Sequence, residues 1–437
     1  MAEKIVKVGL VGFGTIGCGV AKLILEDADV IASKTGIRLQ LSCVVDIDTQ
    51  TQRPVQLPDG VLTNDINKLL DDDTIKVGVE LIGGTDAAKQ IQLQMLQSGK
   101  DVVTANKALL AEYGEEIIKC ARKNNRCIAF EASCAGGIPV ISAIRTGLTA
   151  NQITAMYGIV NGTCNYILSN MTSSNESFAE ALSAAQQKGY AEADPTLDIS
   201  GGDSAHKLAI LASIAFGQEI SLDDIYVEGI EAISIDDIHY GGEMGYVLKL
   251  LAIGEKTEDN KISLRVHPSF IDKKSRLATV SGSFNAISIF GSAVGEVIYY
   301  GRGAGMMPTA SAVVADIIDV ALGNSANTFK HITIKQKDLA DNYIEKIGNL
   351  ISRFYIKLLV KDQAGVFAQI GKILAENSIS ISGILQHEGK DTVPVVITTH
   401  STQQNKITEA LKALAKLDTI CSDPVCIRIV DIPEDKD

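Results

Sequence analysis

The stretch KIVKVGLVGFGTIGCGVAKLILE, residues 4–26, constrains the fold more than any other part of the chain. It begins with an apolar run that is too brief for a helix, and Gly12-Phe13-Gly14-Thr15-Ile16-Gly17 follows at once. The pattern predicts a buried strand, a tight turn and then a helix. A doubly wound α/β domain begins in this way.

The three glycines of this G-x-G-x-x-G turn each have a physical task. Gly12 permits the turn, Gly14 lets a pyrophosphate approach the backbone, and Gly17 lets the helix pack closely on the strand. The N-terminus of the helix then faces the anion. Because the context is right on both sides of the turn, we predict that residues 12–17 bind a dinucleotide, with a purely structural glycine turn as the alternative.

The second predicted strand, LQLSCVVDID, ends in Asp46. An acid at this strand end accepts hydrogen bonds from the ribose 2′-OH of NAD and repels the 2′-phosphate of NADP. The interval along the sequence from the glycine turn to Asp46 exceeds the usual spacing of about 20 residues. We expect a longer helix and a loop to fill this interval. Arg53 lies downstream and could serve NADP instead. We favour NAD, and the alternative is that Asp46 is a plain turn residue.

Further predicted strands alternate with helices. VGVELIGG (77–84) ends beside Gly84 and Thr85, DVVTANK ends in Lys107, and RCIAFEASCAGGIPV contains Glu131. In open parallel sheets, ligands bind outside the carboxyl ends of the strands. We therefore expect these residues and Gly14 to surround one crevice.

The composition limits the partners and the compartment. The formal net charge is −13 and no run is rich in Lys or Arg, so neither nucleic acid nor an anionic membrane is expected as a partner. No apolar stretch approaches the roughly 18–20 residues of a membrane span, and the N-terminus lacks the shape of a signal peptide. The eight cysteines form no C-x-x-C pair, which supports neither a zinc site nor a disulfide framework. We expect a cytoplasmic protein.

A charged pair interrupts an otherwise apolar helix in GGDSAHKLAI, residues 201–210. Asp203 falls in the first turn, where the helix dipole favours an anion, and Lys207 follows on the same face. Partial burial would lower the pKa of Lys207 and make it a proton donor and acceptor. The alternative is an exposed ion pair worth about 0.3–0.5 kcal/mol, and the spacing alone does not decide between the two.

Five segments together resemble the homoserine dehydrogenase family, and they occur in the order of that family from residue 4 to about 325. They are TANKALLA, FEASCAGGIPVI, NGTCNYILSNM, KGYAEADPTLDISGGDSAHKLAILA and YYGRGAGMMPTASAVVADI. The resemblance implies reversible, NAD- or NADP-dependent oxidation of L-homoserine to L-aspartate 4-semialdehyde, in threonine, methionine and isoleucine biosynthesis.

The resemblance also assigns roles to residues. Lys207 matches the catalytic lysine that exchanges a proton with the substrate hydroxyl, and Asp203 matches the acid beside it. Asp198 matches another acid of the same site, and Glu192 resembles the residue that binds the amino group of the substrate. Lys107 resembles a second lysine close to both cofactor and substrate.

A monovalent cation, Na⁺ or K⁺, is implied by the resemblance near the segment EASCAGGI. The matching ligands are Glu131 and the carbonyl groups of Cys134, Gly136 and Ile138. The alternative is a structural turn without an ion, because ligands from the backbone leave little trace in a sequence.

The resemblance implies three domains, with Gly303 and Gly305 closing back over the cofactor crevice. The expected fold class is α/β, with a Rossmann-type NAD(P)-binding domain, an α+β catalytic and dimerisation domain with a mixed sheet, and a ferredoxin-like C-terminal domain. The expected boundaries are 1–135 plus 301–330, then 136–300, a linker at 331–349, and 350–437.

The C-terminal segment SRFYIKLLVKDQAGVFAQIGKILAENSISISGILQ resembles an ACT domain, and Asp362, Gly365 and Val366 carry the match. Such domains bind amino acids between copies, so threonine is the expected effector, and a homodimer or homotetramer is expected. A structural dimerisation domain without a ligand is the alternative. We expect a chain cut near residue 340 to stay active and to lose its response to threonine.

Two rival functions remain at this stage. One is a related dehydrogenase that acts on another small zwitterionic amino acid, and the other is a non-catalytic amino-acid sensor. The retention of Asp203, Lys207, Glu192 and Lys107 argues against the sensor, which would not need to keep a proton shuttle.

Overall fold

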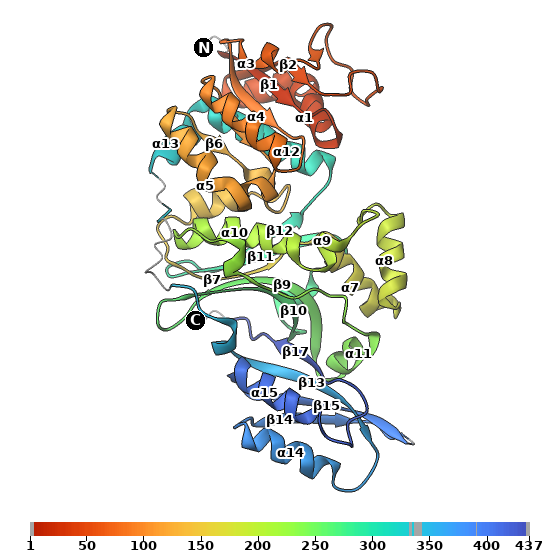
Figure 1. Ribbon diagram of the computed structural model, residues 1–437. Coiled ribbons are helices and arrows are strands. Elements are labelled where there is room, and N and C mark those ends of the chain that lie inside the picture. Colours follow the sequence, from red (N-terminus) through yellow and green to blue (C-terminus); the bar gives the residue numbers. More distant parts are fainter. Residues whose placement is uncertain (1–3, 332–333, 336–342, 390, 434–437) are drawn as a thin grey trace. The chain divides into compact units, whose positions relative to one another are not determined.

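The computed structural model describes residues 4–331, 334–335, 343–389 and 391–433 (Figure 1). The chain forms two compact units. Unit 1 comprises Met1–Ile153, His206–Leu222 and Tyr299–Asp338, and unit 2 comprises Thr154–Ala205, Asp223–Ile298 and Leu339–Asp437. The division falls within a single helix, α10 (Gly202–Phe216), which begins in unit 2 and continues in unit 1.

Unit 1 contains a six-stranded, entirely parallel sheet in the order β3-β2-β1-β4-β5-β6. The chain returns to the centre of the sheet after β3, so the strand order reverses between β1 and β4. In doubly wound sheets, ligands bind at the carboxyl ends of the two strands that flank such a reversal. The strands are β1 (Lys4–Val11), β2 (Ile37–Val45), β3 (Leu62–Thr63), β4 (Ile75–Glu80), β5 (Asp101–Thr104) and β6 (Ile128–Ala129).

Helix α12 (Met306–Leu322), from late in the chain, completes unit 1 by packing against α1 (Thr15–Glu26) and against β2, β4, β5 and β6. Gly19 permits the close approach, since a Cβ there would lie 2.9 Å from the Cβ of Ala310. The other helices of the unit are α2 (Ala28–Thr35), α3 (Asn67–Leu70), α4 (Asp86–Gln97), α5 (Lys107–Lys123), α6 (Val140–Ser142) and α13 (Asn324–His331), with a 3-10 turn at Glu131–Ser133 and a π-turn at Ala143–Gly147.

Unit 2 is built on a mixed sheet of eleven strands. Strands β7, β9 and β10 pair antiparallel, whereas the short β8 pairs parallel with β10. The six strands from the middle of the chain are β7 (Ile153–Ile159), β8 (Tyr226–Val227), β9 (Tyr246–Lys256), β10 (Ile262–Asp272), β11 (Phe284–Gly291) and β12 (Gly295–Arg302). The helices are α7 (Gly162–Ser174), α8 (Phe178–Gln187), α9 (Thr196–Ile199), the start of α10, and α11 (Ile235–Glu243), with 3-10 turns at Leu222–Asp224 and Arg276–Thr279.

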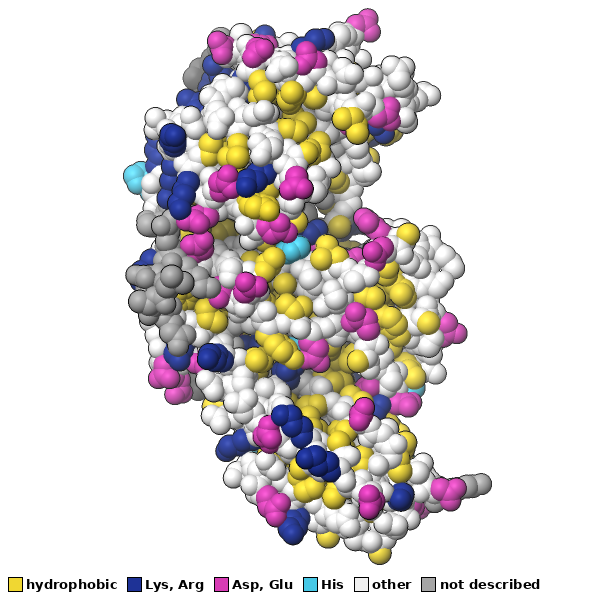
Figure 2. Space-filling view, viewed as in Figure 1, with side chains coloured by type: hydrophobic (Ala, Val, Ile, Leu, Met, Phe, Trp, Pro, Cys, Tyr) yellow, Lys and Arg dark blue, Asp and Glu magenta, His cyan; other side chains and the backbone are white. Residues whose placement is uncertain are grey.

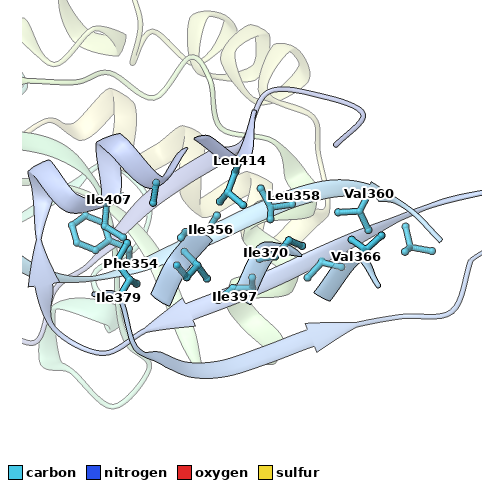
Figure 3. Packing of buried hydrophobic residues seen from close by; sticks show 14 residues of the cluster. Phe354, Ile356, Leu358, Val360, Val366, Ile370, Ile379, Ile397, Ile407 and Leu414 are labelled. Carbon is cyan, nitrogen blue, oxygen red and sulfur yellow. The ribbon is translucent and has the colours of Figure 1, made fainter. Parts of the chain in front are cut away.

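The C-terminal part of unit 2 has the ferredoxin-like strand order β17-β13-β15-β14, as predicted. Gly365, at φ +93°, makes the turn into α14, and the next residue, Val366, is buried. Strand β13 supplies Phe354, Ile356 and Leu358 to the core between sheet and helices (Figure 3). The elements are β13 (Ile351–Lys361), α14 (Val366–Glu376), β14 (Ile381–Gln386), β15 (Thr392–Thr399), β16 (Thr402–Gln403), α15 (Gln404–Leu414) and β17 (Val425–Ile429), after a 3-10 turn at Ile347–Asn349.

Strand β17 also pairs with β10, and this joins the two sheets into one. The pairing is parallel, with Ser269 opposite Arg428 and Phe270 opposite Ile429. The next residue, Val430, is buried in a cluster with Tyr157 and other residues of the middle region. The C-terminal domain is therefore part of the same β-structure as the middle region, which the sequence did not predict.

Part of the expected linker at 331–349 lies outside the described residues, namely 332–333 and 336–342. The described Lys335 hydrogen-bonds to the chain just after α10, through Gly217 and Glu219.

Within the described residues, no single helix is both long and apolar enough to cross a membrane. Among the helices described, only α12 and α13 taken together, with an 83° bend between them, reach such a length and composition. Acidic and basic side chains are interspersed on the face shown in Figure 2.

Candidate functional site

The turn between β1 and α1 has the geometry that the glycines predict. Gly12 has φ +99°, and a Cβ there would lie 2.7 Å from the carbonyl oxygen of Leu81. A Cβ on Gly17 would collide with the carbonyl oxygen of Gly12, whereas nothing lies within 4 Å of the Cβ position of Gly14. Gly14 precedes the first residue of α1, so the open space lies at a helix N-terminus, which suits a pyrophosphate.

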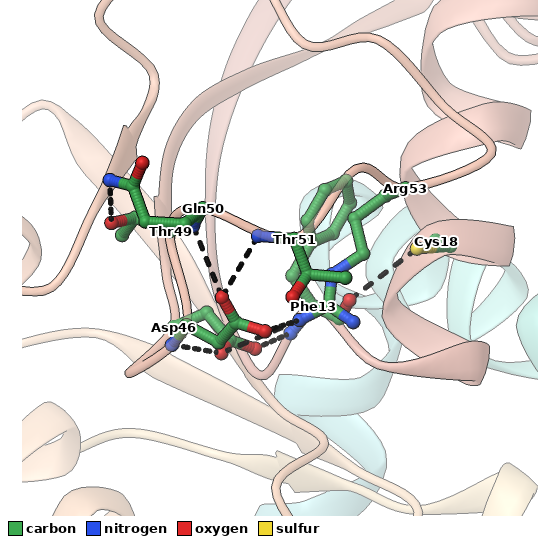
Figure 4. Close-up of polar contacts among 8 residues, drawn as sticks. Phe13, Cys18, Asp46, Thr49, Gln50, Thr51 and Arg53 are labelled. Carbon is green, nitrogen blue, oxygen red and sulfur yellow. Dashed lines mark hydrogen bonds and ion pairs between the residues drawn. The ribbon is translucent and has the colours of Figure 1, made fainter.

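Asp46 directly follows β2 and points toward this turn (Figure 4). Its Oδ2 accepts a hydrogen bond from the backbone N–H of Phe13 at 2.6 Å, and its Oδ1 accepts one from Asp48 at 2.8 Å. The Arg53 guanidinium lies 3.3 Å from the Asp48 carboxylate and 4.0 Å from that of Asp46. Two helices, α1 and α2, and then β2 fill the long interval between the glycines and Asp46, where a longer helix and a loop were expected.

The loops after β4 and β5 are tied together by Asn106. Its Nδ2 donates to the carbonyl oxygen of Gly84 at 2.6 Å, and its Oδ1 accepts from the N–H of Leu109. Because this side chain caps α5, Lys107 is the first residue of that helix, and the predicted strand end at Lys107 is corrected to Thr104. Thr85 likewise precedes α4, after two glycines with positive φ. The parts predicted to surround a dinucleotide thus lie at the carboxyl ends of neighbouring strands.

Glu131 is buried and its carboxylate caps the short helix α6. Its two oxygens accept hydrogen bonds from Ile141 and Ser142, each at 2.7 Å. The backbone N–H of Glu131 donates to Asp316 on α12 at 2.7 Å. Burial raises the pKa of Glu131, and it raises the pKa of Asp316 to about 8. The Glu131 side chain therefore has a structural role that the sequence did not predict.

The turn that follows Glu131 packs against the segment before α12. A Cβ on Gly136 would lie 2.5 Å from the carbonyl oxygen of Gly303, and Gly305 leads into α12 at φ +119°. The Cys134 thiol lies 3.8 Å from the carbonyl oxygen of Lys207, and the carbonyl of Ile138 accepts from Val140. No cluster of three or more His, Cys, Asp or Glu suited to a metal occurs among the described residues. Any cation here would depend on carbonyl oxygens, the donors that hard cations prefer.

Asn161 joins the two acids that precede and begin α10. It is 4% exposed, and its Nδ2 donates to Asp198 at 2.7 Å and to Asp203 at 2.8 Å. Its Oδ1 accepts from the N–H of Cys164 and so caps α7. Thr163 adds a 3.2 Å hydrogen bond to Asp198. A neutral amide that donates to both acids stabilises two carboxylates placed close together.

Helix α10 carries Asp203 and Lys207 on one face, and both are buried. Asp203 is 4% exposed and Lys207 is 9% exposed. An exposed ion pair was one of two alternatives, and these values exclude it. Burial of an ammonium group costs free energy unless its surroundings compensate, so the position of Lys207 favours a chemical task.

Glu192 is exposed, in the segment between α8 and α9. Its carbonyl oxygen accepts a hydrogen bond from Gln186. Among the contacts of the described part of the chain, none joins its carboxylate to Asp198 or Asp203. The structure brings the two aspartates together through Asn161.

Two polar residues at this site were not predicted. The first is Asn161, which lies between β7 and α7. The second is the fully buried Glu80, which accepts from Ile82, Gln92 and Thr104 and so supports the loops after β4 and β5. The signal available in the sequence was the position of each residue. Glu80 is the last residue of β4, and Asn161 follows closely after the end of β7.

Three family models together match most of the chain. The model for homoserine dehydrogenase matches residues 139–318, and that for the NAD-binding domain of homoserine dehydrogenase matches residues 12–131. The ACT domain model matches residues 354–419.

Individual proteins are similar over the full length. A homoserine dehydrogenase of Pseudomonas aeruginosa is 42% identical over 435 residues, which cover 98% of this chain and 99% of that protein. The crystal structure of a homoserine dehydrogenase from Thiobacillus denitrificans matches with a TM-score of 0.89 at 39% identity, over 98% of this chain and 99% of that one. A hyperthermophilic archaeal homoserine dehydrogenase in complex with NADPH matches with a TM-score of 0.62 at 26% identity, over 76% of this chain and 100% of that one. These matches decide against the sensor and against a dehydrogenase of another amino acid. The chain belongs to the homoserine dehydrogenase family, whose members are NAD(P)-dependent oxidoreductases that interconvert L-homoserine and L-aspartate 4-semialdehyde.

Proposed function

We propose that Lys207 and Asp203 carry the proton transfer of this reaction. The main support is α10, where a lysine only 9% exposed follows four residues after an aspartate only 4% exposed. The aspartate is fixed by a buried asparagine, so it can hold the ammonium form of the lysine in one place. A proton shuttle needs such a fixed and shielded amine.

Oxidation of homoserine removes a proton from the hydroxyl oxygen and a hydride from C4. In the proposed mechanism, the neutral amine of Lys207 takes the hydroxyl proton while the carbon–oxygen bond becomes a carbonyl. The nicotinamide, when bound, accepts the hydride. In the reverse direction, the Lys207 ammonium returns the proton to the carbonyl oxygen, and Asp203 stabilises that ammonium.

The substrate is a zwitterion, so its ammonium group calls for carboxylates and its carboxylate calls for a cation. We propose Asp198, Glu192 and Lys107 as the substrate-binding residues. The hydrogen bonds from Asn161 and Thr163 support Asp198. Glu192 rests on the family resemblance and on its exposed position, from which its side chain can meet a ligand. Lys107 is supported by its place at the start of α5, beside the loop that contains Gly84.

Replacement of Lys207 tests the proposal. We expect Lys207→Ala to lower kcat by about 10²–10⁴-fold, while the Kd for NAD(P) changes less than about twofold, because only the proton transfer is removed. Lys119→Ala is the matched control, since Glu115 and Lys119 form an exposed acid–lysine pair with the same spacing on α5. Steady-state assays with homoserine and fluorescence titration with cofactor measure both values. Loss of cofactor binding with residual turnover would contradict the role of Lys207.

We further propose NAD as the preferred cofactor. Asp46, Asp48 and Arg53 carry a summed charge of −1, and the guanidinium of Arg53 is already next to both carboxylates. Hydrogen bonds from Thr51 lead the causes that lower the pKa of Asp48 to about 2, so this acid is charged at neutral pH. A 2′-phosphate would meet net negative charge, whereas a 2′-OH can donate to Asp46.

Parallel assays with NAD and NADP test this preference. We expect a lower KM for NAD than for NADP. We expect Asp46→Ser to reduce or reverse this difference in KM, because the charge that repels the 2′-phosphate is removed. Asp29→Asn is the control, since Asp29 lies on α2 and forms an exposed ion pair with Arg38 of β2. A wild-type enzyme that prefers NADP would contradict the assignment.

A monovalent cation is proposed at the turn 134–138. Its donors would be Glu131 and the carbonyl oxygens of Cys134, Gly136 and Ile138, and the Glu131 carboxylate also accepts two backbone hydrogen bonds that hold it in place. Initial rates in KCl, NaCl and tetramethylammonium chloride at equal ionic strength test it. Equal rates in all three salts would remove the cation from the proposal.

We propose that the C-terminal ACT domain binds threonine and that the enzyme is a homodimer or homotetramer. Support comes from the match of residues 354–419 to the ACT domain and from its complete ferredoxin-like sheet. Rates with and without threonine, and light scattering of the eluted protein, check the two parts separately. Rates unaffected by threonine would contradict the effector, and a monomer would contradict the assembly.

We propose the cytoplasm as the compartment. All eight cysteines are free thiols, and five of them are buried. A reducing compartment keeps thiols in this form.

A further inference from the structure

Arg428, on the C-terminal strand β17, makes charge-assisted contacts with the middle region of unit 2. It is 6% exposed. Its guanidinium donates to Glu228 at 2.7 Å and to Gln404 at 2.9 Å, and it lies 4.9 Å from the centre of the Tyr226 ring. The Tyr226 hydroxyl also donates to Glu228 at 3.1 Å. One buried cation therefore fixes Glu228 from two sides, directly and through the neighbouring tyrosine.

Glu228 begins a segment, residues 228–230, that is pressed against the chain just before α10. The N–H of Glu228 donates to Val266 on β10 at 2.8 Å, which anchors the segment to the sheet. Gly229 lies so close to Ser200 that a Cβ would be 2.7 Å from its Cα. The N–H of Ile230 donates to the carbonyl oxygen of Ile199 at 2.8 Å. The position of residues 199 and 200 thus depends on where residues 228–230 are held.

Residues 199–201 connect the two acids of the proposed substrate site. Asp198 precedes them on α9, and Asp203 follows in the first turn of α10. Gly201 has φ +88°, and a Cβ there would lie 3.0 Å from Val227. The turn therefore has little room to move while residues 227–230 stay in place.

We infer that Arg428, through its contact with Glu228, is a positioning residue for the homoserine site. The pair holds residues 228–230 against the turn at 199–201, and this fixes the two carboxylates that flank the turn. The inference rests on the roles proposed above for Asp198 and Asp203. It assigns a task in substrate binding to a residue of the C-terminal domain, far along the chain from the other site residues.

The side chains differ in what their loss would do. Glu228 is 40% exposed, so it can turn toward water when Arg428 is removed. Arg428 is 7% exposed at its side chain, so loss of Glu228 leaves a buried cation poorly paired and endangers the fold. Arg428→Met is therefore the primary variant, Glu228→Gln is the second, and Arg428→Lys is the conservative one.

Steady-state kinetics with homoserine test the inference. We expect Arg428→Met and Glu228→Gln to raise the KM for homoserine roughly tenfold, since small misplacements of binding groups have effects of this size. The KM for NAD(P) should stay near the wild-type value, and Arg428→Lys should recover part of the loss. Arg353→Gln is the control, because Arg353 also lies in the C-terminal domain but donates to Tyr246 and Asp431 instead.

Two outcomes would overturn the inference. One is a folded Arg428→Met enzyme, by circular dichroism and thermal melting, with an unchanged KM for homoserine. The other is an equal rise in KM in Arg353→Gln, which would indicate a general loss of stability. Asp198→Asn separates this failure from that of the proposed function, because an unchanged KM in Asp198→Asn contradicts the substrate site itself.

Discussion

At the scale of single residues, the carboxyl group of Asp316 links the fold of unit 1 to pH. It is 6% exposed on α12 and accepts the backbone N–H of Glu131. Burial is the main cause that raises its pKa to about 8, and the neighbouring Glu131 carboxylate adds to the effect. In an unfolded chain the same group has a pKa near 3.8. At a pH between these two pKa values, the Asp316 carboxyl group is protonated in the folded protein and ionised in the unfolded chain.

This difference fixes the sign of the pH dependence. The stabilisation from Asp316 is complete below about pH 4 and is lost as pH rises toward 8, at about 1.4 kcal/mol per pH unit. Asn at this position does not titrate and can still accept the N–H of Glu131. We therefore expect the free energy of unfolding of Asp316→Asn, relative to wild type, to rise between pH 5 and 7.5. Denaturant titrations at several pH values measure it, with Asp319→Asn on the same helix as the control, and a difference independent of pH would contradict the expectation.

Asn161 shows the limit of residue-scale prediction. Its place after a strand and before Gly162 is typical of a helix cap, and it is one. Nothing in the local pattern indicates that its Nδ2 also reaches Asp198 and Asp203, because those contacts depend on how α9 and α10 return to the same strand end. That Asp203 and Lys207 share one face of a helix, by contrast, was predictable from their spacing of four residues.

At the scale of elements, the β1–α1 turn offers a matched pair of glycines. A methyl group at Gly17 would collide with the backbone of Gly12, whereas one at Gly14 meets nothing within 4 Å and its φ of −74° suits any residue. We expect Gly17→Ala to lower the Tm and to abolish cofactor binding. Gly14→Ala should keep its Tm and bind NAD(P) at least about tenfold more weakly, because the methyl group occupies the approach of the pyrophosphate. Thermal melting and cofactor titration separate the two, and wild-type affinity in Gly14→Ala would remove this turn from the cofactor site.

The elements themselves were largely predictable, but some of their ends were not. The glycine turn and the strand before Asp46 follow from local patterns of apolar and glycine residues. The ferredoxin-like fold of the C-terminal domain was implied by the resemblance to an ACT domain. The end of β5 was misplaced because Asn106 caps α5, and the strand ends three residues before Lys107, at Thr104. A cap of this kind depends on a side-chain rotamer, which a pattern of residue types does not specify.

At the scale of the whole molecule, the shared sheet changes what truncation would do. From the sequence we expected a chain cut near residue 340 to stay active. That cut removes β17, which leaves Ser269 and Phe270 of β10 without their partners on this edge, and it removes Val430 from a buried cluster. We expect a chain of residues 1–340 to have a lower Tm, to aggregate and to lose most of its activity, because newly exposed apolar surface and a newly exposed strand edge promote association.

Size-exclusion chromatography, thermal melting and homoserine assays of the truncated chain check this expectation. A soluble, monodisperse and fully active truncated enzyme would contradict it and would restore the view of a detachable domain. The pairing of β10 with β17 was out of reach for sequence reasoning, since parallel strands far apart in the chain leave no turn between them to recognise.

The pairing of Phe270 with Ile429 also has a consequence for biosynthesis. The ribosome makes β10 roughly 160 residues before its partner, and at 5–20 residues per second this leaves the strand edge waiting for about 8–30 seconds. During that interval the nascent middle region exposes backbone hydrogen-bonding groups of β10 that are covered only after β17 has been synthesised. Chaperones that shield unpaired strands should thus associate with this polypeptide while it is still being translated, and a nonsense mutation before residue 425 should yield a product that is degraded rather than an unregulated enzyme.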